Sequence, residues 1–278
     1  MKYFEVPIDV MTKGKSDYEA ILTGYVPDNI MQNEKQRVRP AVLILPGGGY
    51  EYTSDREAEP IALEFLSKGI CAFVLRYSIA PARFPQALCE ALESISYIRE
   101  HANEWDIDTN NIVVCGFSAG GHLCASVGVF WNNPILDAYI NKNRNLVKPN
   151  MLILSYPVIT SGVYAHRESF EALLGENQTQ ENIELVSLEK QVTKDVPPTF
   201  IWHTYEDGLV PVQNTILFAN ELITKGIPTE VHIYRRGGHG LSLGNHLVDV
   251  QREFGEEHMS SEWIQHTIRF IFDNKDLI

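Results

Sequence analysis

Residues 113–122 of the chain read Val113-Val114-Cys115-Gly116-Phe117-Ser118-Ala119-Gly120-Gly121-His122. An apolar run typical of a buried strand stops at small residues, and an apolar helical pattern begins directly afterwards. The serine lies in the spacing G-x-S-x-G, in which the two glycines let a strand turn sharply into a helix. Such a turn strains the backbone of the serine and exposes its hydroxyl above the sheet. The pattern therefore predicts a nucleophile elbow centred on Ser118.

Strand-like apolar runs alternate with helical patterns along most of the chain, which is typical of parallel βαβ units. The expected strands are 3–8, 20–26, 41–45, 70–75, 112–115, 151–155, 199–203 and 230–234. The expected helices are 58–68, 85–101, 119–130, 212–225 and 260–272. The first two strands have no helix between them and are expected to form an antiparallel edge hairpin, whereas the later, almost continuously apolar strands suit a sheet covered on both faces. We expect an α/β protein with an eight-stranded, mostly parallel sheet.

A helix-start motif precedes the helix expected at 58–68. Residues Ser54-Asp55-Arg56-Glu57 have the spacing of a capping box. In that motif the serine and the glutamate side chains bond to each other's backbone N–H groups. We therefore expect Glu57 to serve the first turn of this helix.

One segment breaks the alternation of strands and helices. Between residues 157 and 198 there is no convincing strand, only a short amphipathic piece at 168–174 and a polar stretch at 176–184. Ligands bind at the C-terminal edge of the strands in open α/β folds, so an insertion here is placed to fold over that edge. We expect residues 1–278 to form a single domain with 157–198 as a cap or lid.

Composition limits which binding partners and which cell compartment are compatible with the chain. Of 278 residues, 44% are hydrophobic and 21% charged, and the formal net charge of -13 disfavours nucleic acid or an anionic membrane surface as partner. The four cysteines lie in apolar segments without C-x-x-C spacing, which indicates free thiols in a reducing compartment. The first 17 residues hold no continuous apolar segment, and no stretch approaches the roughly 18 apolar residues that span a bilayer. We expect a soluble cytoplasmic protein. The sequence leaves its oligomeric state open, and a homo-oligomer is among the alternatives.

A serine hydroxyl is a weak nucleophile, so the elbow requires a histidine base and a carboxylate that orients it. His239 follows the strand 230–234, and its glycine neighbours leave the imidazole room to reach Ser118. Most other histidines have structural explanations: His232 lies inside a strand, His203 ends one, His122 follows the elbow and packs against the sheet, and His101 and His266 lie on helical faces. His246 and His258 lie in polar segments and are left as candidate substrate contacts.

The carboxylate should follow a strand and precede the histidine in the chain. Asp207 does so after the strand 199–203, in a turn before a glycine, and Glu206 is its near rival. A carboxylate in a surface turn usually caps or hydrates. However, Ser118, Asp207 and His239 follow one another in the Ser, Asp, His order of α/β-hydrolases, each on a loop after its own strand. This order favours Asp207 as the acid.

Oxyanion stabilisation requires backbone donors near the serine. The first turn of the helix after the elbow presents the N–H of Ala119, and the glycine run at 47–49 after the strand 41–45 presents those of Gly48 and Gly49. Glycine-rich loops also bind phosphate, but this one matches neither G-x-G-x-x-G nor G-x-x-x-x-G-K-[ST]. We therefore expect this loop to bind no nucleotide. We also expect no other cofactor and no metal.

Four ordered motifs together resemble a known family of enzymes. They are Pro46-Gly47-Gly48-Gly49-Tyr50, Gly116-Phe117-Ser118-Ala119-Gly120-Gly121-His122, Trp202-His203-Thr204-Tyr205-Glu206-Asp207 with Val210-Pro211, and Gly238-His239-Gly240-Leu241-Ser242. They resemble the α/β-hydrolase esterases related to hormone-sensitive lipase, and within these the bacterial acetyl-xylan esterases or xylanase-associated sugar hydrolases. The similarity runs from about Val42 to Leu243. Pro46 departs from the pattern, because many of these esterases have histidine there.

The resemblance implies a carboxylesterase that removes acetyl or other short acyl groups, including those on sugar hydroxyls. Its partner would be a small-molecule ester. Acidic residues interrupt every apolar run in 157–198, Glu168 and Glu171 among them, so we expect no surface for a fatty chain. The same three side chains would also serve an amide, formamide or peptide hydrolase, because leaving-group preference depends on pocket shape. A non-catalytic binding protein on the same fold is the alternative from another class.

Overall fold

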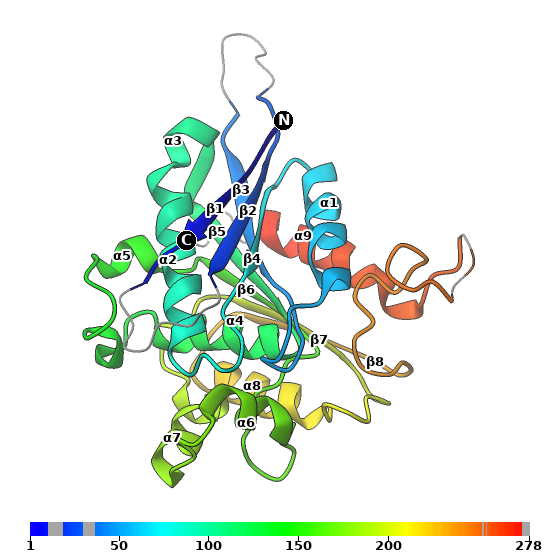
Figure 1. The fold of residues 1–278 in the computed structure, drawn as a ribbon. Helices are drawn as coiled ribbons and strands as arrows, with labels where there is room; N and C mark the ends of the chain where they lie inside the picture. The colour runs from blue at the N-terminus through cyan, green and yellow to red at the C-terminus, as the bar shows by residue number, and fades with distance from the viewer. Residues whose placement is uncertain (11–18, 30–36, 252, 254, 274–278) are drawn as a thin grey trace.

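The computed structural model describes residues 1–10, 19–29, 37–251, 253 and 255–273, so residues 11–17 of the N-terminal stretch considered above lie outside it. Its strands form one eight-stranded sheet in the order β1-β2-β4-β3-β5-β6-β7-β8 (Figure 1). The strand bounds are β1 Lys2–Ile8, β2 Ala20–Val26, β3 Arg39–Leu45, β4 Cys71–Arg76, β5 Ile107–Phe117, β6 Met151–Ser155, β7 Thr199–Thr204 and β8 Thr229–Tyr234. The expected bounds agree within two residues, except that β5 begins five residues earlier.

The pairing of the strands confirms the predicted topology. β1 pairs antiparallel with β2, and β2 pairs antiparallel with β4. All other neighbours, from β4 and β3 across to β7 and β8, pair in parallel. The edge hairpin, the mostly parallel sheet and the α/β class were therefore predicted correctly.

Helices cover both faces of the sheet. The longer ones are α1 Glu59–Ser67, α2 Gln86–Glu100, α4 Ala119–Phe130, α8 Gln213–Thr224 and α9 Trp263–Asp273. The shorter ones are η1 Asp55–Glu57, α3 Ala102–Trp105, η2 Pro134–Leu136, α5 Arg144–Val147, α6 Arg167–Leu174, α7 Gln180–Leu185, η3 Leu188–Gln191 and η4 Met259–Glu262. Successive strand side chains point to opposite faces, so the core has two halves: one joins the sheet to α2, α4 and α8, the other to α1 and α9.

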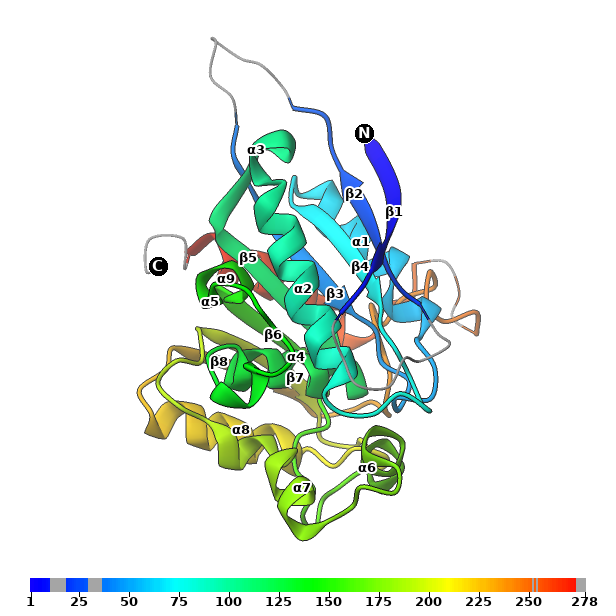
Figure 2. The ribbon, with the colours of Figure 1, turned by 60° about the vertical axis from the view of Figure 1, so that its left-hand side comes forward.

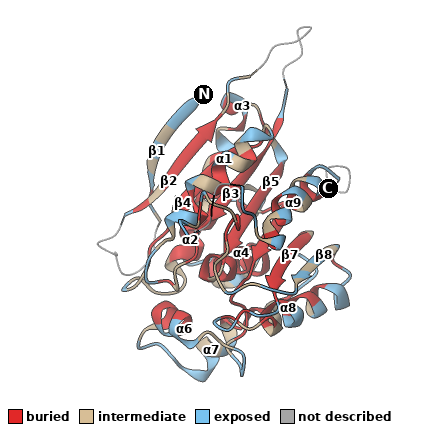
Figure 3. Ribbon diagram, turned by 90° about the vertical axis from the view of Figure 1, so that its right-hand side faces the viewer, coloured by how far each residue is buried: buried red, intermediate tan, exposed pale blue. Residues whose placement is uncertain are grey.

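Burial is concentrated in the central strands and on the helix faces that meet them, whereas the outer surfaces are exposed (Figure 3). The four cysteines are buried free thiols. Within the described residues, no helix combines the length and apolar character needed to cross a bilayer.

The C-terminal ends of the parallel strands meet at one edge of the sheet. Residues 157–198 connect β6 to β7 and form α6, α7 and η3, and the two small helices lie near this edge (Figure 2). Apolar side chains of the segment, including Phe170, Leu173 and Val186, belong to the same buried cluster as the α2, α4 and α8 half of the core. The segment is therefore packed onto the sheet rather than extended away from it.

Candidate active site

Ser118 occupies the sharp turn between β5 and α4. Its backbone has φ 54° and ψ −118°, a conformation that side-chain-bearing residues rarely adopt. The turn needs glycine on both sides: a Cβ on Gly116 would lie 2.1 Å from the Gly120 carbonyl oxygen, and one on Gly120 would lie 2.1 Å from that of Leu45. The G-x-S-x-G spacing is thus explained by two close backbone contacts, one within the turn at Gly116 and one between the turn and β3 at Gly120.

Three of the predicted side chains meet above this turn. The Ser118 Oγ lies 2.7 Å from His239 Nε2, and His239 Nδ1 lies 2.7 Å from Asp207 Oδ2. A carboxylate only accepts, so Nδ1 carries the proton and donates it to Asp207, which leaves Nε2 to accept the hydroxyl of Ser118. This arrangement activates a serine for attack on a carbonyl carbon.

Asp207 is held as an ionised group. Its Oδ1 accepts the backbone N–H groups of Leu209 and Val210 at 3.0 and 2.9 Å, and His203 Nε2 lies 3.2 Å from Oδ2. Burial by itself raises the pKa of Asp207, but the hydrogen bonds from His203 and His239 outweigh it and hold the pKa well below its ordinary value. His203 therefore supports the acid rather than a substrate.

The rival carboxylate points elsewhere. Glu206 is exposed, and its Oε2 accepts the Gly237 N–H at 3.3 Å. Among the described residues it makes no hydrogen bond to His239. Residues 235–244 are here called the histidine loop. Glu206 thus contacts this loop at Gly237 and not at the imidazole of His239.

The glycine loop, residues 46–50, runs beside the nucleophile turn. Gly48 and Gly49 have φ of 129° and 67°, and a Cβ on Gly48 would lie 2.1 Å from the Tyr52 carbonyl oxygen. Within the described part of the chain, the backbone N–H groups of Gly48, Gly49 and Ala119 donate to no hydrogen bond. They therefore remain available to an oxyanion.

The predicted capping box is not formed. Ser54 makes no side-chain cap bond, and its N–H donates to the Gly47 carbonyl instead. The Glu57 side chain turns into the core, where its Oε2 accepts the Gly47 N–H at 2.8 Å. The spacing was right for a cap, but the tertiary contact with the glycine loop replaces the local one.

His122 lies between the glycine loop and residues 157–198, and not against the sheet as predicted. Its Nε2 donates to the Val186 carbonyl at 2.8 Å, and its Nδ1 accepts the Tyr50 hydroxyl at 2.9 Å. The ring also packs edge-on against Phe170 of α6. His122 thus links the nucleophile helix to two other segments at the site.

The neutral state of His122 should make stability depend on pH. Burial lowers its pKa from 6.5 to about 4, so the unfolded chain binds more protons between these values and the free energy of unfolding falls as pH falls. We expect this one group to contribute a loss of about 2 kcal/mol between pH 7 and pH 5. Urea unfolding at both pH values should show a correspondingly smaller loss for His122→Gln. An identical loss in both proteins would contradict the assignment.

His166 and Ser169 at the start of α6 were not singled out from the sequence. His166 Nδ1 lies 2.9 Å from Ser169 Oγ. The Ser169 Oγ faces Gly49 and would lie 3.9 Å from a Cβ placed on that glycine. Burial lowers the pKa of His166, and the charge of Glu168 opposes this shift. The charge of His239 lowers the pKa further and that of Asp207 raises it. The available signal was the polar His-x-x-Ser spacing at a helix start in a segment expected near the site. His246 and His258, left as substrate contacts, remain untested in that role.

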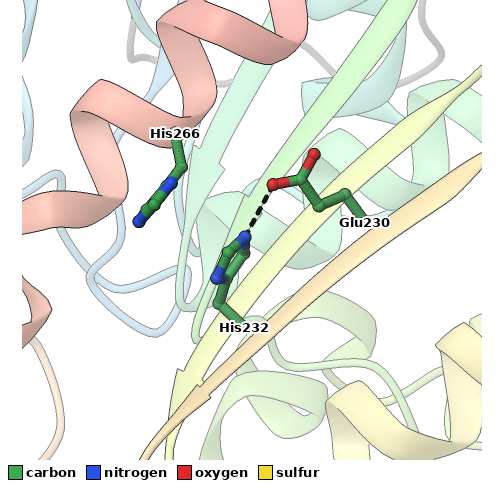
Figure 4. A group of neighbouring side chains, drawn as sticks. All are labelled: Glu230, His232 and His266. Carbon is green, nitrogen blue, oxygen red and sulfur yellow. Dashed lines mark hydrogen bonds and ion pairs between the residues drawn. The ribbon is translucent and has the colours of Figure 1, made fainter.

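One group of described residues offers three side chains of the kind that bind metals: Glu230 and His232 on β8, and His266 on α9 (Figure 4). His232 Nε2 lies 2.7 Å from a Glu230 carboxylate oxygen. The two imidazoles stack face to face, with centroids 4.6 Å apart and planes inclined by 20°. Stacked rings do not aim their in-plane lone pairs at one point, so we assign no ion to this group.

The hydrogen-bonded series Ser118–His239–Asp207, here called the relay, lies on loops at the C-terminal ends of the parallel strands. Together with the unused backbone donors beside it, the relay defines a serine hydrolase of the α/β-hydrolase class. Residues 28–222 match the model of the BD-FAE family. The chain belongs to this family of α/β-hydrolase esterases.

Individual relatives agree with the family. Endo-1,4-beta-xylanase B of Butyrivibrio fibrisolvens is 39% identical over 247 residues, or 85% of this chain and 38% of that protein. An acetylxylan esterase of Xylanibacter ruminicola is 30% identical over 210 residues, or 73% and 41%. The chain thus spans about two fifths of the length of these two relatives. Among solved structures, an acetyl ester-xyloside bifunctional hydrolase from Caldicellulosiruptor lactoaceticus is 34% identical, with a TM-score of 0.79 over 93% of this chain and 89% of that one.

Proposed function

We propose that this chain is a serine carboxylesterase that removes short acyl groups, above all acetyl, from sugar hydroxyls such as those of acetylated xylo-oligosaccharides. The observation that carries the reaction class is the hydrogen-bonded series from Ser118 through His239 to Asp207. The names of an acetylxylan esterase and an acetyl ester-xyloside hydrolase among the similar proteins support the acetyl group and the sugar.

In the proposed reaction Ser118 Oγ attacks the ester carbonyl while His239 Nε2 accepts its proton. The N–H groups of Gly48, Gly49 and Ala119 donate to the oxyanion that forms. His239 then returns the proton to the departing alcohol oxygen and leaves an acyl-enzyme. Water, deprotonated by His239, then attacks the acyl carbonyl, the bond to Ser118 Oγ breaks as His239 returns the proton to that oxygen, and the acid leaves. Asp207 keeps the imidazole in the tautomer that presents Nε2 to the serine.

We further propose that residues 157–198 are a cap that limits the acyl group. Ser169 faces Gly49, and His166 is bonded to Ser169, so the side of α6 next to the glycine loop is polar. The large apolar side chains of α6, Phe170, Leu173 and Leu174, are buried in the core and are not available to a fatty chain. A polar, nearby wall favours a short acyl group.

Chain length of the acyl group tests this proposal. We expect kcat/KM to be highest for acetyl to butyryl esters and to fall at least about tenfold at octanoyl, which corresponds to roughly 1.4 kcal/mol of transition-state binding. A panel of p-nitrophenyl esters measures the series, and acetylated xylo-oligosaccharides, a formamide and a peptide amide belong in the same panel. Equal or faster hydrolysis of the octanoyl ester would reject the short-acyl proposal, and preferential cleavage of the amides would reject the esterase.

The cytoplasmic location and the metal-free reaction stay predictions. The free state of Cys71, Cys89, Cys115 and Cys124 supports a reducing compartment.

A further inference from the structure

We propose that Glu57 is a positioning residue that holds the glycine loop and the histidine loop in register with each other. This inference rests on the proposed function, because it assigns Glu57 a task in that reaction. Glu57 lies at the end of η1, does not take part in the relay from Ser118 to Asp207, and is 4% exposed. Buried carboxylates are costly unless both oxygens are bonded, so its partners indicate its task.

Each carboxylate oxygen serves a different loop. Oε2 accepts the Gly47 N–H at 2.8 Å, which fixes the residue before Gly48. Oε1 accepts the Tyr156 hydroxyl at 2.6 Å, and the Tyr156 oxygen accepts the Ser242 N–H at 3.0 Å. Ser242 is three residues after His239 in the histidine loop. One carboxylate thus joins the loop of the oxyanion donors to the loop of the base.

The contacts also lie close to the reacting side chains. A Cβ on Gly47 would lie 2.7 Å from Glu57 Oε2 and 2.9 Å from the Cβ of Ser118, so no other side chain fits between them. The Tyr156 ring meets the His239 ring edge-on, with centroids 5.2 Å apart. A displacement of Glu57 would therefore be passed to both the donors and the base.

The hydrogen-bond donors fit an ionised Glu57. Gly47 and Tyr156 both donate to it, and the Tyr156 oxygen already accepts from Ser242. Burial is the largest influence and keeps the pKa of Glu57 above its ordinary value, whereas those two bonds and the charges of His239 and Arg56 oppose the rise. The charged or titratable groups around the pair are Arg56, Cys115 and Tyr156 near Glu57, and Asp207 and His166 near His239. The carboxylate thus favours the protonated imidazole that forms during the reaction.

Two variants separate the bonding from the charge. Glu57→Gln keeps the shape, but its amide NH₂ faces a donor, and the negative charge is lost. We expect kcat for p-nitrophenyl acetate to fall on the order of 10- to 100-fold with KM nearly unchanged, as for a misplaced catalytic group. We also expect the acid limb of the kcat/KM profile to move to lower pH, because the negative charge that favours a protonated imidazole is removed. Tyr156→Phe breaks the link to Ser242 but keeps the carboxylate, so kcat should fall while the acid limb stays in place.

The matched control is Glu59→Gln, an exposed glutamate two residues away on α1, which should behave like the wild type. A folded Glu57→Gln protein with wild-type kcat and an unmoved acid limb would overturn the proposal. If Glu57→Gln does not fold, unchanged kcat in Tyr156→Phe overturns it just as well. Fluorophosphonate labelling of the wild type keeps the two proposals apart, since a wild type that is neither labelled at Ser118 nor active would reject the proposed function itself.

Discussion

Ser118→Ala should abolish ester hydrolysis, with kcat lowered on the order of 10⁶-fold, the usual loss when a triad nucleophile is removed. The hydroxyl lies 2.7 Å from His239 Nε2, and in the proposed reaction it contributes chemistry rather than packing. Alanine keeps the Cβ, so the strained turn and the contacts of Gly116 and Gly120 are retained. The measurement is steady-state hydrolysis of p-nitrophenyl acetate, together with far-UV circular dichroism and thermal unfolding.

Covalent labelling provides the second arm of this experiment. A fluorophosphonate should label the wild type on Ser118 and leave the alanine variant unlabelled. Ser126, a buried serine on α4, the helix that follows Ser118, offers the matched control, since Ser126→Ala should keep both labelling and activity. If purified Ser118→Ala keeps more than about a hundredth of the activity, Ser118 is not the nucleophile.

Changes at the base and the acid should rank next. His239→Ala removes the proton acceptor and should cost nearly as much as the serine change. Asp207→Asn should lower kcat on the order of 10⁴-fold. Its Oδ1 keeps the bonds from Leu209 and Val210, but its NH₂ then faces the N–H of His239, and the imidazole must adopt the tautomer that no longer accepts from Ser118.

Glu206→Gln is the control for the acid, because Glu206 precedes Asp207 and bonds only to the Gly237 N–H among the described residues. It should lower kcat only mildly. Kinetics of the three purified variants at saturating substrate decide the roles. A crippled Glu206→Gln beside a tolerated Asp207→Asn would move the orienting role one residue upstream.

The sheet and the central relay could be read from the sequence because their signals are local. Parallel strands buried on both faces are apolar throughout, and the elbow and the glycine run require particular residue types at fixed spacing. β5 was underestimated because its first part, Asp108 to Asn111, is polar and extends beyond the apolar run. Chain order then selected Asp207 and His239 among several candidates.

The rest of the site depends on contacts between distant segments. Glu57 has the spacing of a cap, and only the approach of Gly47 and Tyr156 gives its carboxylate other donors. His122 was expected against the sheet, but residues 157–198 bring the Val186 carbonyl to it across 64 positions. His166 enters the site for the same reason. Sequence periodicity indicates which side chains lie on each face of one helix or strand. It does not indicate which other segment will pack against that face.

The position of β8 has a consequence for how activity is lost. Among the strands that the structure describes, β8 carries the histidine loop and pairs with β7 alone, whereas β5, which leads to Ser118, is paired on both sides. Edge strands open at a lower free energy than the centre of a sheet. Local opening at that edge would separate His239 from Ser118, 121 positions apart in the chain, while the central strands remained paired. Under mild denaturation, inactivation would then precede the loss of most secondary structure. The half-life of the activity would depend on how easily β8 separates from β7 rather than on the stability of the core.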